Sequence, residues 1–132
     1  MSAQYSAEWV HKAEEDYLAA LTLARQKKIS TPNAVCFHAQ QCAEKYLKAF
    51  LAARDVDIPR IHDLNQLNDL CTALDADFAM LAESLIALNP YAVEFRYPGE
   101  SATVEEARHA ITLMQQVRSF IRAKLGLTPR QQ

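Results

Sequence analysis

Hydrophobic residues recur at steps of three and four through most of the chain, which is the spacing of helices with one buried face. Such stretches run from Ser6 to about Lys28, from Pro32 to about Arg54, from Asp63 to Leu88, and from Val104 to about Leu125. No stretch alternates with the period of two that is typical of strands. The pattern therefore predicts an all-α fold, an antiparallel up-and-down helical bundle of four main helices with short helical pieces.

Local signals mark the ends of these helices. Ser6 is a candidate N-cap of the first, and Thr31-Pro32 supplies a cap followed by proline at the first helical position of the second. Thr103 and Glu106 have the spacing of a capping box before the last helix, and Gly126 follows that helix as its C′ residue. These signals predict the boundaries without reference to packing.

The third stretch contains an internal signal. Asp75 lies between two leucine-rich segments and is a candidate second cap, so the stretch is one kinked helix or two short ones. Asn89-Pro90 ends it, because the residue before proline is pushed out of the α region.

Length and composition predict one domain, residues 1–132, with an ordered core from about 6 to 126. No apolar run reaches the roughly 20 residues of a membrane span and no signal peptide follows Met1, so we expect a cytoplasmic protein that does not enter a membrane. The three cysteines are expected to be reduced thiols in the core. The formal net charge of −2 argues against a protein that coats duplex DNA.

The segment from Ala34 to Leu51 combines a broad apolar arc with a polar stripe on the opposite side. The stripe consists of Gln41, Glu44, Lys45 and Lys48, at positions i, i+3, i+4 and i+7. Such a stripe is either a solvated helix face or part of a site that holds an anion. The pattern leaves both interpretations open.

Several familiar chemistries are absent from the sequence. It has no glycine-rich phosphate loop and no paired C-x-x-C or H-E-x-x-H motif. His38 and Cys42, one helical turn apart, lack a third and a fourth metal ligand. We therefore expect no metal and no cofactor, and any phosphate must be bound by side chains or helix N-termini.

Side chains suited to anions occur in three places, namely Lys45 and Lys48, then His62, and then Arg96 beside Tyr97. An arginine in a loop before Tyr-Pro is restricted in geometry and can bind phosphate through two nitrogens. The alternative for Arg96 is a salt bridge to one of three acidic residues, which are Glu44, Glu94 and Glu100. The alternative for His62-Asp63 is an N-cap of the third helix.

Three blocks of this sequence resemble the HEPN domain family, the higher eukaryotes and prokaryotes nucleotide-binding domain. They are QCAEKYLKA at 41–49, HDL at 62–64 and RYP at 96–98, which precedes the capped final helix. The resemblance extends from about Trp9 to Leu125. Trp9 itself is interpreted as a core anchor rather than a stacking platform.

The resemblance implies an antiparallel bundle that forms a homodimer and that is often encoded beside a minimal nucleotidyltransferase, as toxin and antitoxin. Active members of the family are metal-independent endoribonucleases that carry an arginine followed after four to six residues by a histidine. This chain lacks that motif, because the next histidine after Arg96 is His109, thirteen residues on. The sequence therefore leaves enzymatic activity open.

These observations lead to one main prediction and two alternatives. The main prediction is a protein that binds a nucleotide or RNA phosphate and partners a minimal nucleotidyltransferase. Its predicted ligand-binding residues are Gln41, Glu44, Lys45, Lys48, His62, Arg96 and Tyr97. The alternatives are a ribonuclease toxin that uses Arg96 with His62 or His109, and a non-catalytic dimeric scaffold.

Overall fold

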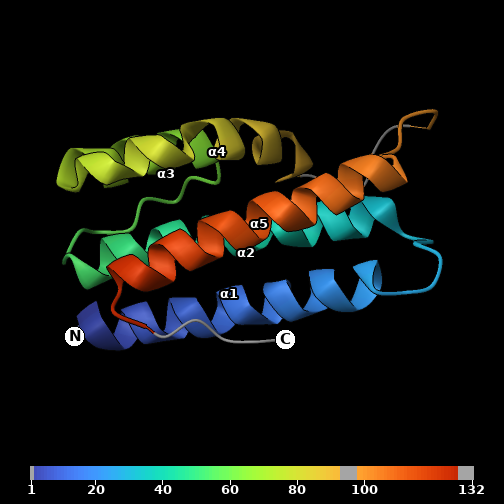
Figure 1. The fold of residues 1–132 in the computed structure, drawn as a ribbon. Helices are drawn as coiled ribbons and strands as arrows, with labels where there is room; N and C mark the ends of the chain where they lie inside the picture. The colour runs from blue at the N-terminus through green and yellow to red at the C-terminus, as the bar shows by residue number, and fades with distance from the viewer. Residues whose placement is uncertain (1, 93–97, 128–132) are drawn as a thin grey trace.

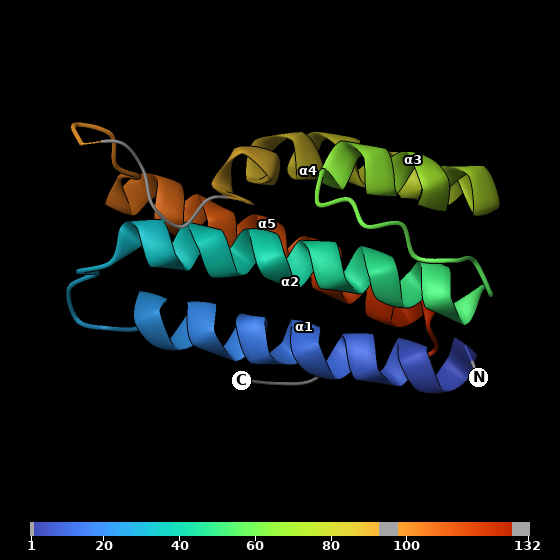
Figure 2. The same cartoon turned by 180° about the vertical axis from the view of Figure 1, so that it is seen from behind.

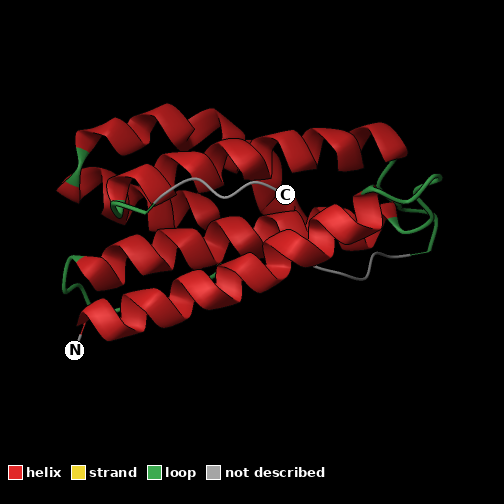
Figure 3. Ribbon diagram, turned by 60° about the horizontal axis from the view of Figure 1, so that its bottom comes forward, coloured by secondary structure: helices red, strands yellow, loops and turns green. Residues whose placement is uncertain are grey.

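The structure is a computed structural model, and it describes residues 2–92 and 98–127. Every regular element in these two ranges is helical (Figures 1 and 3). The elements in chain order are α1 (Ser2–Ala24), α2 (Pro32–Ala53), α3 (Leu64–Leu74), η1 (Ala76–Leu81), α4 (Ala82–Leu88), η2 (Asn89–Ala92) and α5 (Val104–Lys124). The all-α fold predicted from the sequence is confirmed.

Helix α2 lies in the middle of the bundle and contacts α1, α3, α4, η2 and α5 (Figures 1 and 2). Helices α1 and α2 are antiparallel, the arm formed by η1 and α4 runs back in the direction of α1, and α5 returns in the direction of α2. The four main directions therefore alternate as expected, with α3 as an additional short piece.

The predicted signals at both ends of α5 are present. The Thr103 hydroxyl accepts a hydrogen bond from the Glu106 amide at 3.0 Å, and the Glu106 side chain accepts one from the Thr103 amide at 2.9 Å. At the other end Gly126 takes a φ of 74°, and the Leu127 amide donates to the Arg122 carbonyl at 2.8 Å. This hydrogen-bond pattern is a Schellman C-cap.

The third stretch is two short helical pieces rather than one kinked helix. Asp63 caps α3 by accepting a hydrogen bond from the Gln66 amide, and Asp75 caps η1 by accepting one from the Asp77 amide. The backbone of Asp75 is extended, so the helix cannot pass through it. Asp63 therefore has the capping role that the sequence suggested for the His62-Asp63 pair.

The predicted N-cap role of Ser6 is wrong. Helix α1 begins at Ser2, and Ser6 lies buried within it. Its hydroxyl donates to the carbonyl of Ala49 on α2 at 2.9 Å. A serine hydroxyl is available for capping only when it has no hydrogen-bond partner elsewhere in the fold. Here a carbonyl of α2 is that partner.

The connector between α2 and α3, residues 54–63, reverses the chain immediately after α2. Asp55 adopts a left-handed φ of 61°, and the Val56 amide donates to the Leu51 carbonyl at 3.0 Å. The connector then runs back along α2, so that the carbonyl of His62 lies 3.4 Å from the side-chain nitrogen of Gln40 (Figure 2). This turn brings His62 beside the middle of α2.

The hydrophobic core fills the space around α2, where Phe50 packs on Phe78, with ring centroids 4.4 Å apart. All three cysteines are buried in the core, as the sequence predicts. Burial raises the pKa of the Cys71 thiol to about 12. It also raises the pKa of the Cys42 thiol. None of the helices in the described ranges is long and apolar enough to cross a membrane.

Candidate functional site

Two of the four residues in the polar stripe of α2 are buried rather than solvated. Glu44 and Lys48 retain 3% and 5% of their surface, respectively, because α1 and the connector cover that side of the helix. The residues of α2 that stay partly open form a narrow stripe, and those beyond its first turn are Phe37, His38, Gln41 and Lys45. The interpretation as an ordinary solvent-facing stripe is therefore wrong for half of its members.

Glu44 is the centre of a first polar cluster, the His62 cluster, which consists of Glu44, Lys48 and His62. One carboxylate oxygen, Oε2, accepts from the Lys48 ammonium at 3.0 Å and from His62 Nδ1 at 2.8 Å. The His62 side chain is 73% exposed although its partner carboxylate is buried. A carboxylate only accepts hydrogen bonds, so the proton lies on Nδ1 and the second ring nitrogen, Nε2, is left for another partner.

Gln40 supports this cluster and was missed by the sequence analysis. Its side chain is completely buried, and its Nε2 atom lies 3.5 Å from Glu44 Oε1 and 3.4 Å from the His62 carbonyl. Gln41, which was predicted to bind ligand, donates to Gln40 Oε1 at 2.7 Å. The side-chain amide of Gln40 thus links the Glu44 carboxylate to the backbone of the connector.

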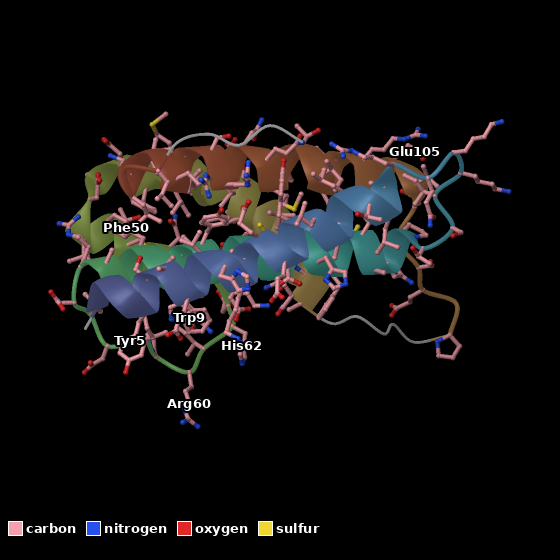
Figure 4. The ribbon with its side chains drawn as sticks, turned by 90° about the horizontal axis from the view of Figure 1, so that it is seen from below. Tyr5, Trp9, Phe50, Arg60, His62 and Glu105 are labelled. Atoms are coloured by element: carbon pink, nitrogen blue, oxygen red, sulfur yellow. The ribbon has the colours of Figure 1, made fainter. Side chains whose placement is uncertain are left out.

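Trp9 borders the His62 cluster and is not a core anchor as predicted. It is partly exposed, and the Lys48 ammonium lies 5.3 Å from its ring centroid, a cation–π contact. Trp9 also lines a hollow of about 220 Å³ together with Tyr5 and with Ala52, Asp55, Val56, Asp57 and Ile58 at the end of α2 and in the connector. Tyr5, Trp9 and His62 lie on one face of the molecule (Figure 4).

A second polar cluster, the His38 cluster, joins α1 to the other flank of the open stripe. The Asp16 carboxylate, which is buried, accepts from His38 Nδ1 at 2.8 Å and from the Lys45 ammonium. Burial acts to raise the pKa of Asp16, but the hydrogen bonds from His38 and Lys45 outweigh it and lower the pKa below its usual value. The predicted ligand residue Lys45 therefore belongs to this cluster and not to that of His62.

A third cluster, the inner cluster, consists of Glu14, Tyr46, Arg118 and Arg122 and is enclosed by α1, α2 and α5. Arg118 binds both oxygens of the Glu14 carboxylate, at 2.7 and 2.9 Å, and Tyr46 donates to the same carboxylate. Arg122 donates to the Tyr46 hydroxyl at 3.1 Å. Burial acts to raise the pKa of Glu14, but these hydrogen bonds lower it, while burial and the nearby carboxylate raise the pKa of Tyr46.

Asp16, Glu14 and Arg118 are not among the site residues predicted from the sequence. A signal for Asp16 is present, because it falls on the apolar arc of α1 between Ala13 and Ala20, where a charged side chain requires a partner. The identity of that partner does not follow from the sequence. Arg118 likewise falls on the apolar arc of α5, one turn from the buried residues Met114 and Ile121.

The remaining predicted residues do not join these clusters. His109 is exposed on α5 and makes no hydrogen bond with the described residues. Arg96 and Tyr97 lie outside the described residues, as does Glu94, so the predicted convergence of Arg96 with His62 and Lys48 stays a prediction. Within the described ranges the structure brings together Glu44, Lys48 and His62.

The His38–Cys42 pair considered as a metal site does not form one. His38 directs Nδ1 at Asp16, and Cys42 is fully buried in the core. Across the described ranges, no three His, Cys, Asp or Glu side chains are grouped so as to hold a metal ion.

Comparison with known proteins identifies the family of this chain. It is similar to ST0689, an archaeal HEPN homologue, with 21% identity over 91% of this chain and 97% of that one and a TM-score of 0.73, a likeness that concerns the fold alone. It is also similar to TT1696 from Thermus thermophilus, with 27% identity over 90% and 97% of the two chains and a TM-score of 0.72. No curated protein matches the chain. The family model described as HEPN domain matches residues 6–124, and the chain belongs to this family.

Proposed function

We propose that this HEPN protein binds a nucleotide or an RNA phosphate at the His62 cluster. The observation that carries the proposal is that the two partners of one hydrogen bond differ greatly in solvent exposure. Glu44 is buried and fixed, whereas His62, at 2.8 Å from it, is largely exposed. A side chain held in one orientation by a buried carboxylate, with its other ring nitrogen outward, is typical of a site that meets a ligand.

The surroundings suit a phosphorylated ligand. His62 offers Nε2 as a hydrogen-bond donor when the ring is protonated, and the exposed cation Arg60 extends from the same connector (Figure 4). Trp9 and Tyr5 lie on this face beside the hollow at the end of α2, where a base has aromatic surface to contact. Arg96 and Tyr97 are proposed to complete the site, as the sequence blocks suggest.

Membership in the HEPN family supports two further parts of the proposal. We propose that the protein forms a homodimer and that it partners a minimal nucleotidyltransferase in a toxin–antitoxin-type pair. Co-expression with such a partner, followed by size-exclusion chromatography with light scattering, tests both. A monomer that never co-elutes with the transferase contradicts this part alone.

Binding is tested by calorimetry with ATP, GTP and short single-stranded RNAs. Trp9 is the one tryptophan in the sequence, so its fluorescence provides a second measurement of ligands that bind nearby. We expect His62→Ala to weaken binding about tenfold or more, since it removes a charge-assisted contact. His11→Ala is the matched control, because His11 is also an exposed histidine but lies on α1 rather than in the connector. No binding tighter than about millimolar for any ligand contradicts the proposal.

A second candidate function is metal-independent RNA cleavage, and the Glu44–His62 pair favours it. A carboxylate that orients a histidine through Nδ1 leaves Nε2 to act as a general base. Nε2 then takes the proton of a ribose 2′-hydroxyl, and the oxygen attacks the adjacent phosphorus. The bond to the 5′-oxygen of the next nucleotide breaks, which leaves a cyclic phosphate and a 5′-hydroxyl after that oxygen gains a proton. Arg96 is the candidate for stabilising the phosphate charge.

Cleavage is tested by incubating labelled RNA with the purified protein in EDTA. We expect His62→Ala and Glu44→Gln to abolish any activity, with His109→Ala distinguishing the alternative histidine. RNA that stays intact with and without Mg²⁺ eliminates this function and leaves the binding proposal standing.

A further inference from the structure

The His38 cluster repeats the chemistry of the His62 cluster on the other flank of α2. In each, a buried carboxylate accepts from an imidazole Nδ1 at 2.8 Å and from a lysine ammonium. His38 and Lys45 keep 26% and 24% of their side-chain surface, so both reach the solvent. The proposed function uses one of these groups and leaves the other without a role.

The two clusters present their histidines from different positions along α2. His38 and Glu44, which anchor the clusters on α2, are six residues apart, about 9 Å along the helix axis and about 120° apart around it. This distance exceeds the roughly 3.4 Å rise per nucleotide of a duplex strand, so a strand of two or more nucleotides is long enough to extend from one cluster to the other. Gln41 lies between them on the open stripe and extends the polar surface from one to the other.

Aromatic side chains accompany both clusters. Phe37 is partly exposed and lies edge-on to His38, with centroids 5.4 Å apart and an interplanar angle of 72°. In the His62 cluster the aromatic side chain is Trp9, whose ring centroid lies 5.3 Å from the Lys48 ammonium. Aromatic rings beside cationic side chains are the composition with which proteins bind single-stranded nucleic acid, because bases stack while phosphates are neutralised.

We infer that the open stripe of α2 binds single-stranded RNA of two or more nucleotides, with one phosphate at His62 and another at the Asp16–His38–Lys45 group. This inference rests on the proposed function and specifies its ligand as an oligonucleotide rather than a mononucleotide. His38 is a binding residue of the second position, and Asp16 is a positioning residue that orients it.

The experiment measures affinity as a function of ligand length. Adenosine monophosphate and single-stranded di- and tetra-adenylate are titrated by calorimetry into the wild type, His38→Gln, His62→Gln and the control His11→Gln. We expect the tetranucleotide to bind about tenfold more tightly than the monophosphate, and His38→Gln to weaken the tetranucleotide about fivefold more than the monophosphate. His62→Gln should weaken both ligands, and His11→Gln neither.

The outcomes separate the inference from the function on which it rests. A tetranucleotide that binds no more tightly than the monophosphate, or that is insensitive to His38→Gln, overturns the inference while binding at His62 stands. Absence of binding by every ligand overturns both. Thermal unfolding of each variant verifies its fold. The His38→Gln variant keeps a hydrogen-bond donor for Asp16, because the glutamine side chain carries an amide NH2 group.

Discussion

The inner cluster and the His62 cluster are both centred on a carboxylate, but they differ in the solvent exposure of its partners. In both, a carboxylate on one helix accepts hydrogen bonds from a side chain that is distant in the chain. In the inner cluster, Arg118 binds both carboxylate oxygens of Glu14, and Arg118 and Arg122 are buried at 4% and 6% exposure. Each main partner is enclosed by α1, α2 and α5, so the groups serve one another and the packing of the helices.

In the His62 cluster, one member is exposed to solvent. Glu44 is as well buried as the arginines of the inner cluster, yet His62, which it holds, is mostly exposed. A purely structural pair gains little from an exposed partner, because exposed ion pairs contribute at most about 1 kcal/mol. We therefore propose that the inner cluster serves stability and that the His62 cluster contacts a ligand, a division that substitutions in each cluster can test.

The largest expected effect is the loss of stability when Glu14 is removed. Glu14→Ala leaves the buried Arg118 guanidinium without its carboxylate, and we expect the free energy of unfolding to fall by about 3–5 kcal/mol. Urea denaturation measures the change. The matched control is Glu15→Ala, since Glu15 is a neighbouring glutamate whose side chain is 70% exposed. A loss below about 1 kcal/mol means that the inner cluster does not hold the bundle together.

The effect of Glu44→Ala should be smaller and should appear in two measurements. Lys48 loses its carboxylate but keeps the Trp9 ring beside it, so we expect a loss of about 2 kcal/mol in unfolding free energy. Nucleotide binding should also weaken, because His62 loses its orientation. Glu44→Gln retains an acceptor and should recover most of the stability. A variant that loses stability and binds normally argues against a positioning role for Glu44.

The acid sensitivity of the His38 cluster comes next in size. Because the pKa of Asp16 is lowered in the folded protein, the folded state binds fewer protons, and the stabilisation is complete above the ordinary carboxyl pKa of about 3.9. It is lost as pH falls through the lowered value. We expect Asp16→Asn to reduce the decline in unfolding free energy between about pH 5 and pH 2 by on the order of 1 kcal/mol.

The matched control for this measurement is Asp69→Asn, which replaces an exposed aspartate of α3. Its unfolding free energy should decline with acid as steeply as that of the wild type. The same decline in Asp16→Asn as in the wild type is the result that contradicts a lowered pKa at Asp16. Because Glu14 also has a lowered pKa, part of the wild-type decline remains in every variant.

Helix boundaries could be predicted from the sequence wherever the responsible contacts are local. The capping box at Thr103 joins residues three apart, and Gly126 takes its positive φ within one turn of the helix that it ends. Ser6 shows the limit of such signals. Its hydroxyl donates to the carbonyl of Ala49, 43 residues away, and no local sequence pattern predicts this contact.

The candidate site was predicted in part, for the same reason. The periodicity correctly placed Glu44 and Lys48 one turn apart on one side of α2, where they form an ion pair. It did not determine their solvent exposure, because a polar stripe has the same sequence pattern whether water or the connector covers it. The contact between Glu44 and His62, and that between Lys45 and Asp16, depend on how α1 and the connector pack against α2.

The smallest expected change in stability belongs to the residue with the largest expected change in binding. His62→Ala removes an exposed side chain, so we expect the unfolding free energy to change by less than about 0.5 kcal/mol. The same substitution should weaken nucleotide binding about tenfold. Thermal unfolding and calorimetry on one preparation measure both quantities. If His62→Ala instead costs as much stability as Glu44→Ala, then His62 is a structural partner like Arg118, and the two clusters differ in exposure but not in role.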